Sequence, residues 1–112
     1  MNKRTYINLV RRAQAKGYVV KVLFFWLNSP ELALLRIAER VAKGGHNIPE
    51  PIARRRYVAG INNLFNLFMN EVDYWTIYDN SEYPAAQVAT GEKNDKTIII
   101  ESKFKTIEQY VK

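Results

Sequence analysis

The chain has 112 residues, of which 47% are hydrophobic, and it carries a formal net charge of +6. This length supports one small domain with a core, but it is short for a complete doubly wound α/β fold. The absence of cysteine excludes disulfides and thiolate metal sites, and the presence of one histidine argues against a zinc site. The positive charge favours anionic partners such as nucleotides or nucleic acid, and does not choose between them.

The sequence shows no feature of a membrane protein. The longest apolar run, residues 22–27, is far too short to span a bilayer, and the first residues lack the pattern of a signal peptide. We therefore expect no membrane partner and a cytoplasmic location.

The N-terminal third predicts a helix followed by a strand. Residues 4–16 place apolar side chains on one side of a helix, and Gly17 is expected to end it. Residues 18–27, YVVKVLFFWL, are almost all β-branched, aromatic or leucine and do not alternate with polar residues. This pattern is typical of a strand buried on both faces of a parallel sheet, and only Lys21 departs from it.

A second helix is predicted over residues 30–43. Ser29 is suited to cap it, Pro30 to occupy its first position, and Glu31 to face the positive end of its dipole. Because ligands of open α/β sheets bind beyond the carboxyl ends of strands, Asn28 also lies where a nucleotide could bind. Capping is the role we expect first at this turn.

A third, longer helix is predicted over residues 50–72. Its apolar stripe consists of Ile61, Leu64, Phe65, Phe68 and Val72. Arg54 falls on the same face as this stripe but beyond its core end, so its side chain is expected to point into a cleft rather than into open water. This pattern is the strongest indication in the sequence of one functional arginine.

The C-terminal part predicts strands and a short helix. Residues 74–79 form a second strand, ended by polar residues that include Asp79 and Asn80. Residues 87–90 and 96–101 flank a Gly-containing turn and predict a hairpin, and residues 106–112 predict a terminal helix. We expect strands 18–27 and 74–79 to be parallel neighbours joined by a helical crossover.

An elbow rich in cations lies between the second and third helices, over residues 40–57. Two glycines follow Lys43 as a helix stop would, and two prolines precede the next helix. His46 lies in the turn, where it could contact a phosphate or base, although a role in fixing the loop is preferred. In phosphoryl transfer, guanidinium groups on a closing lid stabilise the charge of the moving group.

These segments together resemble the C-terminal half of the zeta-toxin-like P-loop ATPases. The resemblance covers residues 4–82 and is most specific over residues 22–81, in FFWLNSPELALxRIA, RxxERVxxGGHNIPEPxxRRRY, GINNLFNLF and WTIYDNS. Members of that family are ATP-dependent small-molecule kinases, and zeta toxins proper, which belong to toxin–antitoxin systems, phosphorylate UDP-N-acetylglucosamine. The phosphate-binding motif G-x-x-x-x-G-K-[ST] does not occur here, and the half of the family fold that carries it, together with the general base, has no counterpart in this chain.

The resemblance implies a partial parallel sheet with flanking helices, to which the C-terminal hairpin and helix of residues 85–112 are added in a single domain of residues 1–112. It implies Arg40 and Arg54 as lid arginines. The residues implied to support nucleotide or phosphate binding are Arg55, Arg56, His46, Asn28, Asp79 and Asn80. ATP and Mg²⁺ are the cofactors of the full-length family, and we expect neither to bind tightly to this chain or to support kinase activity in it.

Two other functions compete with a lid-bearing kinase portion, whether that portion is a remnant or was cut from a longer protein. A basic module could hold single-stranded nucleic acid by charge and stacking, which is less favoured because most aromatic residues fall on predicted core faces. A regulatory protein could instead pair with a separate chain that carries the phosphate loop. If strand 18–27 has no neighbour on one side, we expect a homodimer at that edge, unless the hairpin folds back over it.

Overall fold

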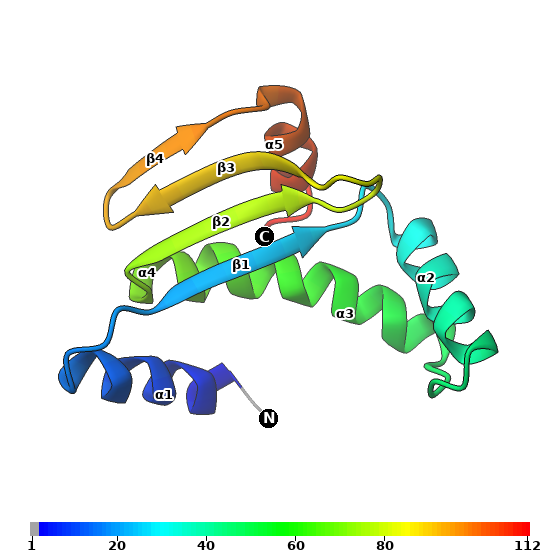
Figure 1. The fold of residues 1–112 in the computed structure, drawn as a ribbon, viewed down its shortest axis with the longest axis horizontal. Helices are drawn as coiled ribbons and strands as arrows, with labels where there is room; N and C mark the ends of the chain where they lie inside the picture. The colour runs from blue at the N-terminus through cyan, green and yellow to red at the C-terminus, as the bar shows by residue number, and fades with distance from the viewer. Residues whose placement is uncertain (1–2) are drawn as a thin grey trace.

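The computed structural model describes residues 3–112, and its helices and strands follow in one continuous domain (Figure 1). The order is α1 (Lys3–Ala15), β1 (Lys21–Trp26), α2 (Pro30–Ala42), α3 (Glu50–Asn63), the π-helical turn η1 (Leu64–Phe68), α4 (Met69–Glu71), β2 (Tyr74–Asp79), β3 (Ala86–Glu92), β4 (Asp95–Ile98) and α5 (Glu101–Glu108). None of the helices in this range combines the length and the apolar composition that a membrane span requires.

The four strands form one mixed sheet in the order β1-β2-β3-β4 (Figure 1). β1 and β2 are parallel neighbours, in register from Lys21 opposite Tyr74 to Trp26 opposite Asp79, as predicted. β3 and β4 are antiparallel additions on the other side of β2. The fold is therefore α/β, and the hairpin extends the sheet instead of forming a separate layer.

One face of the sheet carries the core. Alternate residues of the strands pack there against α3, η1 and α5, and Figure 1 shows these helices on one side of the strands. The members that are almost fully buried are Trp26, Ile61, Leu64, Val72, Trp75, Ile77, Val88, Ala89, Phe104 and Ile107. Gly91 also belongs to this face, because a Cβ there would overlap the Trp75 ring. The predicted stripe of the long helix is thus confirmed as core.

The opposite face of the sheet is bare, which corrects one prediction. β1 was expected to be buried on both faces, yet Leu23 and Phe25 are 57% and 55% exposed. Tyr74, on the same face of β2, is 43% exposed. The physical reason is that all the described helices pack at the core face or at the sheet's ends, so an apolar sequence on both sides of β1 finds cover on only one. We call this bare surface the open face.

β1 is also an edge strand. Among the described residues, β2 is its only neighbour in the sheet, and the C-terminal hairpin pairs with the far side of β2. The idea that this hairpin covers the β1 edge is therefore wrong. The short connection between β2 and β3, residues 80–85, favours direct pairing of these consecutive strands, and β3 takes the side of β2 that β1 leaves free.

The ends of the helices follow their predicted signals in α2 but not in α5. Ser29 caps α2 by accepting a hydrogen bond from the Leu32 N–H at 3.1 Å, and the helix is closed by Gly44, whose φ of 99° suits glycine. The terminal helix was predicted over residues 106–112 but spans Glu101–Glu108. It begins earlier because Phe104 and Ile107, one helical turn apart, are both drawn into the core.

Candidate functional site

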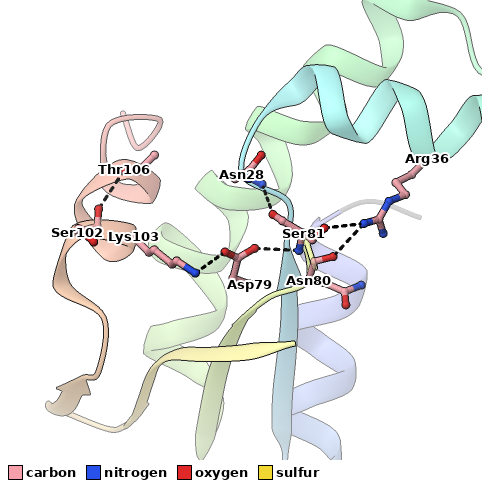
Figure 2. Close-up of polar contacts among 8 residues, drawn as sticks. All are labelled: Asn28, Arg36, Asp79, Asn80, Ser81, Ser102, Lys103 and Thr106. Carbon is pink, nitrogen blue, oxygen red and sulfur yellow. Dashed lines mark hydrogen bonds and ion pairs between the residues drawn. The ribbon is translucent and has the colours of Figure 1, made fainter. Parts of the chain in front are cut away.

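Polar residues gather where β1 and β2 end side by side. Asn80 donates its backbone N–H to the Trp26 carbonyl at 2.7 Å, and Asn28 donates its N–H to the Ser81 hydroxyl at 3.0 Å (Figure 2). Ser81 in turn donates its N–H to a carboxylate oxygen of Asp79 at 2.9 Å. These bonds fix the turn of residues 79–81 at the carboxyl edge of two parallel strands, where α/β sheets commonly bind ligands.

Asp79 is the most buried charged residue of this turn. Its side chain is 8% exposed, and its second carboxylate oxygen lies 2.8 Å from the Lys103 Nζ of α5 (Figure 2). Burial alone would raise the pKa of Asp79, but Lys103 and Ser81 outweigh it and hold that pKa below its ordinary value. Asp79 is therefore a fixed, ionised partner of Lys103 and is poorly suited to be a general base at neutral pH.

A cleft of about 380 Å³ opens beside this ion pair, and we call it the α5 cleft. Its lining residues are Trp26, Asn28, Asp79, Ser81, Glu82, Pro84, Ala86, Lys103 and Thr106. The charges in it are largely satisfied, because Lys103 already neutralises Asp79. The α5 cleft thus holds two of the predicted site residues, Asn28 and Asp79, in a structural arrangement.

Tyr57 closes the end of β1 from the helix side. Its hydroxyl donates a hydrogen bond of 2.6 Å to the Leu27 carbonyl. Burial raises the pKa of this tyrosine to about 12, against a smaller opposing effect of the nearby Trp26 indole N–H. That indole N–H is buried and has no hydrogen bond of acceptable geometry within the described chain, although it lies close to the Tyr57 hydroxyl. Tyr57 is therefore a neutral structural donor.

A second hollow, of about 390 Å³, lies on the other side of the turn, between the end of β1 and α2. We call it the α2 hollow, and its lining residues are Phe25, Leu27, Arg36, Glu39, Arg40, Lys43 and Asn80. Arg36 is anchored there, because its guanidinium donates to the carbonyls of Ser81 at 3.0 Å and Asn80 at 3.4 Å (Figure 2). Three cations thus face one carboxylate around a concave surface.

Arg40 and Lys43 differ from Arg36 in having no fixed partner. Neither side chain forms an ion pair or hydrogen bond with any other residue in the described range 3–112. Both are exposed, Arg40 in the last turn of α2 and Lys43 at its C-cap. Two of the predicted site residues, Arg40 and Asn80, therefore line the α2 hollow together, and the positive charge of Arg40 is unpaired there.

The second predicted lid arginine lies elsewhere. Arg54 bridges the starts of α2 and α3, with its guanidinium nitrogens 2.8 Å from Glu31 and 3.2 Å from Glu50. Its side chain is 44% exposed, so it lies at the surface and does not enter a cleft. Arg40 and Arg54 are thus at different points of the elbow, and two carboxylates neutralise the charge of Arg54.

The remaining predicted residues do not join either hollow. Arg55 and Arg56 are exposed on α3, and His46 is exposed in the loop between α2 and α3. None of the three lines the α5 cleft or the α2 hollow. They contribute positive or titratable surface to the elbow, away from the turn of residues 79–81.

Sequence reasoning missed Lys103 and Arg36, the two cations that hold this turn. Arg36 was placed on a helix face expected to meet solvent or a cleft and was given no role at the site, and Lys103 was not singled out. A signal for Arg36 existed in its place on the same helix face as Arg40 and Lys43. No local signal could have found Lys103, because α5 reaches Asp79 only through the pairing of the hairpin with β2.

Of the two hollows, the α2 hollow is the one suited to the phosphate part of a nucleotide. The cations and the Asn80 side chain of the α2 hollow suit a phosphate group. Within residues 3–112, however, no group of three His, Cys, Asp or Glu side chains is placed to hold a metal ion, and the sequence has no phosphate-loop motif. The residues that line the α2 hollow therefore suit a phosphate group, and the sequence lacks the motif with which P-loop kinases hold Mg²⁺–ATP.

Comparisons of the chain with protein-family models, with curated proteins and with solved structures find no match.

Proposed function

We propose that the protein binds phosphate-bearing ligands of the nucleotide class in the α2 hollow, as the lid-bearing portion of a zeta-toxin-like phosphoryl-transfer fold. The observation that carries this proposal is the pair of free cations, Arg40 and Lys43, beside the carboxyl ends of two parallel strands. Cations that already have carboxylate partners are poor anion sites, whereas unpaired ones gain most from a phosphate.

Each residue of the hollow has a distinct role in this proposal. Arg40 offers a planar fork to two phosphate oxygens, and Lys43 adds a point charge. Arg36, which is held by two carbonyls, keeps the turn of residues 79–81 in place and raises the local potential. Phe25, at the rim, offers an exposed ring for a base.

Catalysis is not expected of this chain alone. Phosphoryl transfer needs a backbone nest around the phosphates and ligands for the metal, and neither is present in the residues that line the hollow. We expect rigorously purified protein to show no Mg²⁺-dependent ATP turnover. Turnover that Arg40→Met abolishes would contradict this expectation.

The binding test uses two probes, ATP and inorganic tripolyphosphate, without metal, in isothermal titration at low salt. The double variant Arg40→Met/Lys43→Met is expected to weaken both by about ten-fold or more, because each charged hydrogen bond contributes about 1.5–3 kcal/mol. The matched control is Arg55→Met/Arg56→Met, which removes the same charge from α3 outside the hollow. Equal losses in the two double variants, or no binding by the unchanged protein, would refute the proposed site.

The two probes also separate phosphate from base recognition. Phe25→Ala is expected to weaken ATP by about five-fold or more, because base–aromatic stacking contributes about 1–3 kcal/mol, and to leave tripolyphosphate unchanged. If Phe25→Ala affects neither probe, the hollow recognises phosphate alone.

A second candidate function is supported by the open face. Phe25 stacks on Tyr78, with ring centroids 5.4 Å apart and planes at 16°, and the Lys21 ammonium lies 5.7 Å from the Tyr74 ring. Exposed aromatic rings on a sheet, next to cations, suit single-stranded nucleic acid. Tyr74→Ala should then weaken binding of a labelled oligouridine, while Tyr83→Ala, at a ring that is 98% exposed outside the sheet, should not. Equal effects of the two variants would exclude stacking on the open face.

A further inference from the structure

The outer edge of β1 has unpaired backbone N–H and C=O groups, and the hydrogen bonds between β1 and β2 show which residues they belong to. The Val20 carbonyl accepts the Tyr74 N–H at 3.2 Å, and the Trp26 carbonyl accepts the Asn80 N–H at 2.7 Å, so even-numbered residues direct their backbone groups toward β2. Alternation along a strand then directs the N–H and C=O groups of Lys21, Leu23 and Phe25 outward. No residue within the described range 3–112 supplies a partner to these groups.

The two edges of the sheet differ in their protection. β4 is four residues long and begins with two charged residues, Asp95 and Lys96, which is a common way to discourage pairing. β1 is six residues long, has its single charge at Lys21, and contains no proline. Its outward residues also bear large exposed side chains on the open face. Of the two edges, β1 is therefore the one built to accept another strand.

We propose that two copies of the protein associate by antiparallel pairing of their β1 strands, centred on Leu23, to form a continuous sheet with a common open face. We propose a second copy as the partner because β1 is complementary to itself in this orientation. When Leu23 lies opposite Leu23 of the second copy, Lys21 lies opposite Phe25 in both halves, and every outward group finds a partner. About six main-chain hydrogen bonds result.

The charges and the strand ends agree with this register. The two Lys21 ammonium groups are kept apart, and each meets a Phe25 ring, an arrangement that Lys21 already has with Tyr74 at 5.7 Å. Beyond Phe25 the edge stops, because the next outward carbonyl, that of Leu27, is occupied by the Tyr57 hydroxyl at 2.6 Å. The pairing is thus limited to the segment that is apolar and free.

The first test is sedimentation velocity of the full chain over a micromolar concentration series. The unchanged protein, with a monomer mass of 13.1 kDa, is expected to sediment as a dimer at the upper concentrations. Leu23→Pro removes an outward N–H and no bond to β2, so it is expected to give a monomer with an unchanged far-UV circular dichroism spectrum. Leu23→Ala keeps the N–H and is expected to remain dimeric at the upper concentrations.

The second test is site-specific cross-linking, which stays informative if Leu23→Pro fails to fold. The sequence has no native cysteine, and directly opposed residues of a hydrogen-bonded antiparallel pair have Cα atoms about 5.5 Å apart, within disulfide range. Leu23→Cys is expected to form a covalent dimer in a glutathione redox buffer. The matched control is Leu35→Cys on α2, where the native side chain is 55% exposed against 57% for Leu23.

The register gives a further prediction for the same assay. Phe25→Cys alone should cross-link poorly, whereas a mixture of Phe25→Cys and Lys21→Cys should give the mixed dimer. A monomer at every concentration would overturn the proposal and leave the edge to a different chain. A dimer in which Leu23→Cys and Leu35→Cys cross-link equally, or one that Leu23→Pro leaves intact, would overturn its location.

Discussion

The two faces of β2 use the same kinds of residue for different purposes. On the core face, Trp75 and Ile77 are 3% and 0% exposed and lie against helices. On the open face, Tyr74 is 43% exposed, and Tyr78 stacks on Phe25 of β1. Both faces are apolar and aromatic in sequence, but only one has helices to cover it. The comparison teaches that an apolar sequence shows which strand faces favour burial. The topology decides whether helices of the same chain bury them.

The largest expected loss of stability comes from a substitution on the core face. Ile77→Ala should lower the free energy of unfolding by about 2–5 kcal/mol, because Ile77 is fully buried and its truncation removes packing contacts and leaves a cavity in the core. Leu23→Ala is the matched change on the open face and should cost much less in urea titrations of tryptophan fluorescence at sub-micromolar concentration, where a β1-paired dimer is dissociated. Similar losses at the two positions would show that the open face is covered.

The next effect concerns the ion pair at the end of β2. Asp79→Asn should lower the free energy of unfolding at pH 7 by about 1–3 kcal/mol, less than for a fully buried pair because the Lys103 side chain is 38% exposed. The folded-state pKa of Asp79 is depressed, so its contribution is present above the unfolded pKa, about 3.9, and is lost as the pH falls through the folded value.

The pH series is therefore the sharper measurement for Asp79. The difference in stability between the unchanged protein and Asp79→Asn should be constant near neutrality and should shrink as the pH falls below about 4. Glu108→Gln, an exposed change on the same helix that carries Lys103, serves as the control and should show no such trend. A difference that grows on acidification would contradict the assigned role of Asp79.

The smallest effect concerns the elbow. Glu31 holds Arg54 at 2.8 Å and Glu50 holds it at 3.2 Å, so removal of the Glu31 charge loosens one of the two ion pairs. If Arg54 is a lid arginine, this loosening should make it more available to a ligand in the α2 hollow. Glu31→Gln should then raise the affinity for tripolyphosphate by about two- to five-fold, the range of an exposed ion pair. Glu101→Gln removes the same charge from α5 and should raise it less. Identical affinities for the two variants would leave Arg54 as a structural residue.

The sequence predicted the parts of the fold that depend on local signals. The cap at Ser29, the stop at Gly44 and the buried stripe with Ile61 and Leu64 were each readable from neighbouring residues, but the π-helical turn η1, which interrupts the predicted helix 50–72, was not. The parallel pairing of β1 and β2 followed from their spacing around a helical crossover. These features need no knowledge of distant segments.

The features that were missed depend on long-range contacts. The exposure of Leu23 and Phe25 follows from which face the helices cover, and β1 itself carries no signal for this. The place of Lys103 beside Asp79 depends on the hairpin and on α5 together. Arg54 was expected in a cleft, but Glu31, in the first turn of α2, provides a nearer partner at the surface.

The structure divides the predicted site residues between two hollows. The carboxyl edge of β1 and β2 was predicted as the place for a ligand, and Arg40 and Asn80 both line the α2 hollow there. Asn28 and Asp79 are at the same edge but on the other side of the turn, in the α5 cleft. Sequence periodicity predicts which face of a helix or strand a residue occupies. It does not predict on which side of the turn of residues 79–81 a side chain will lie.

The measurement that tests the account most directly is a titration of isotope-labelled protein with ATP, followed by backbone amide chemical shifts. The account predicts that the shifts that change most belong to Phe25, Arg40, Lys43 and Asn80, around the α2 hollow, while those of Ile77 and Phe104 in the core face stay in place. Changes centred on Asp79 and Lys103, or no changes at any ATP concentration, would contradict it.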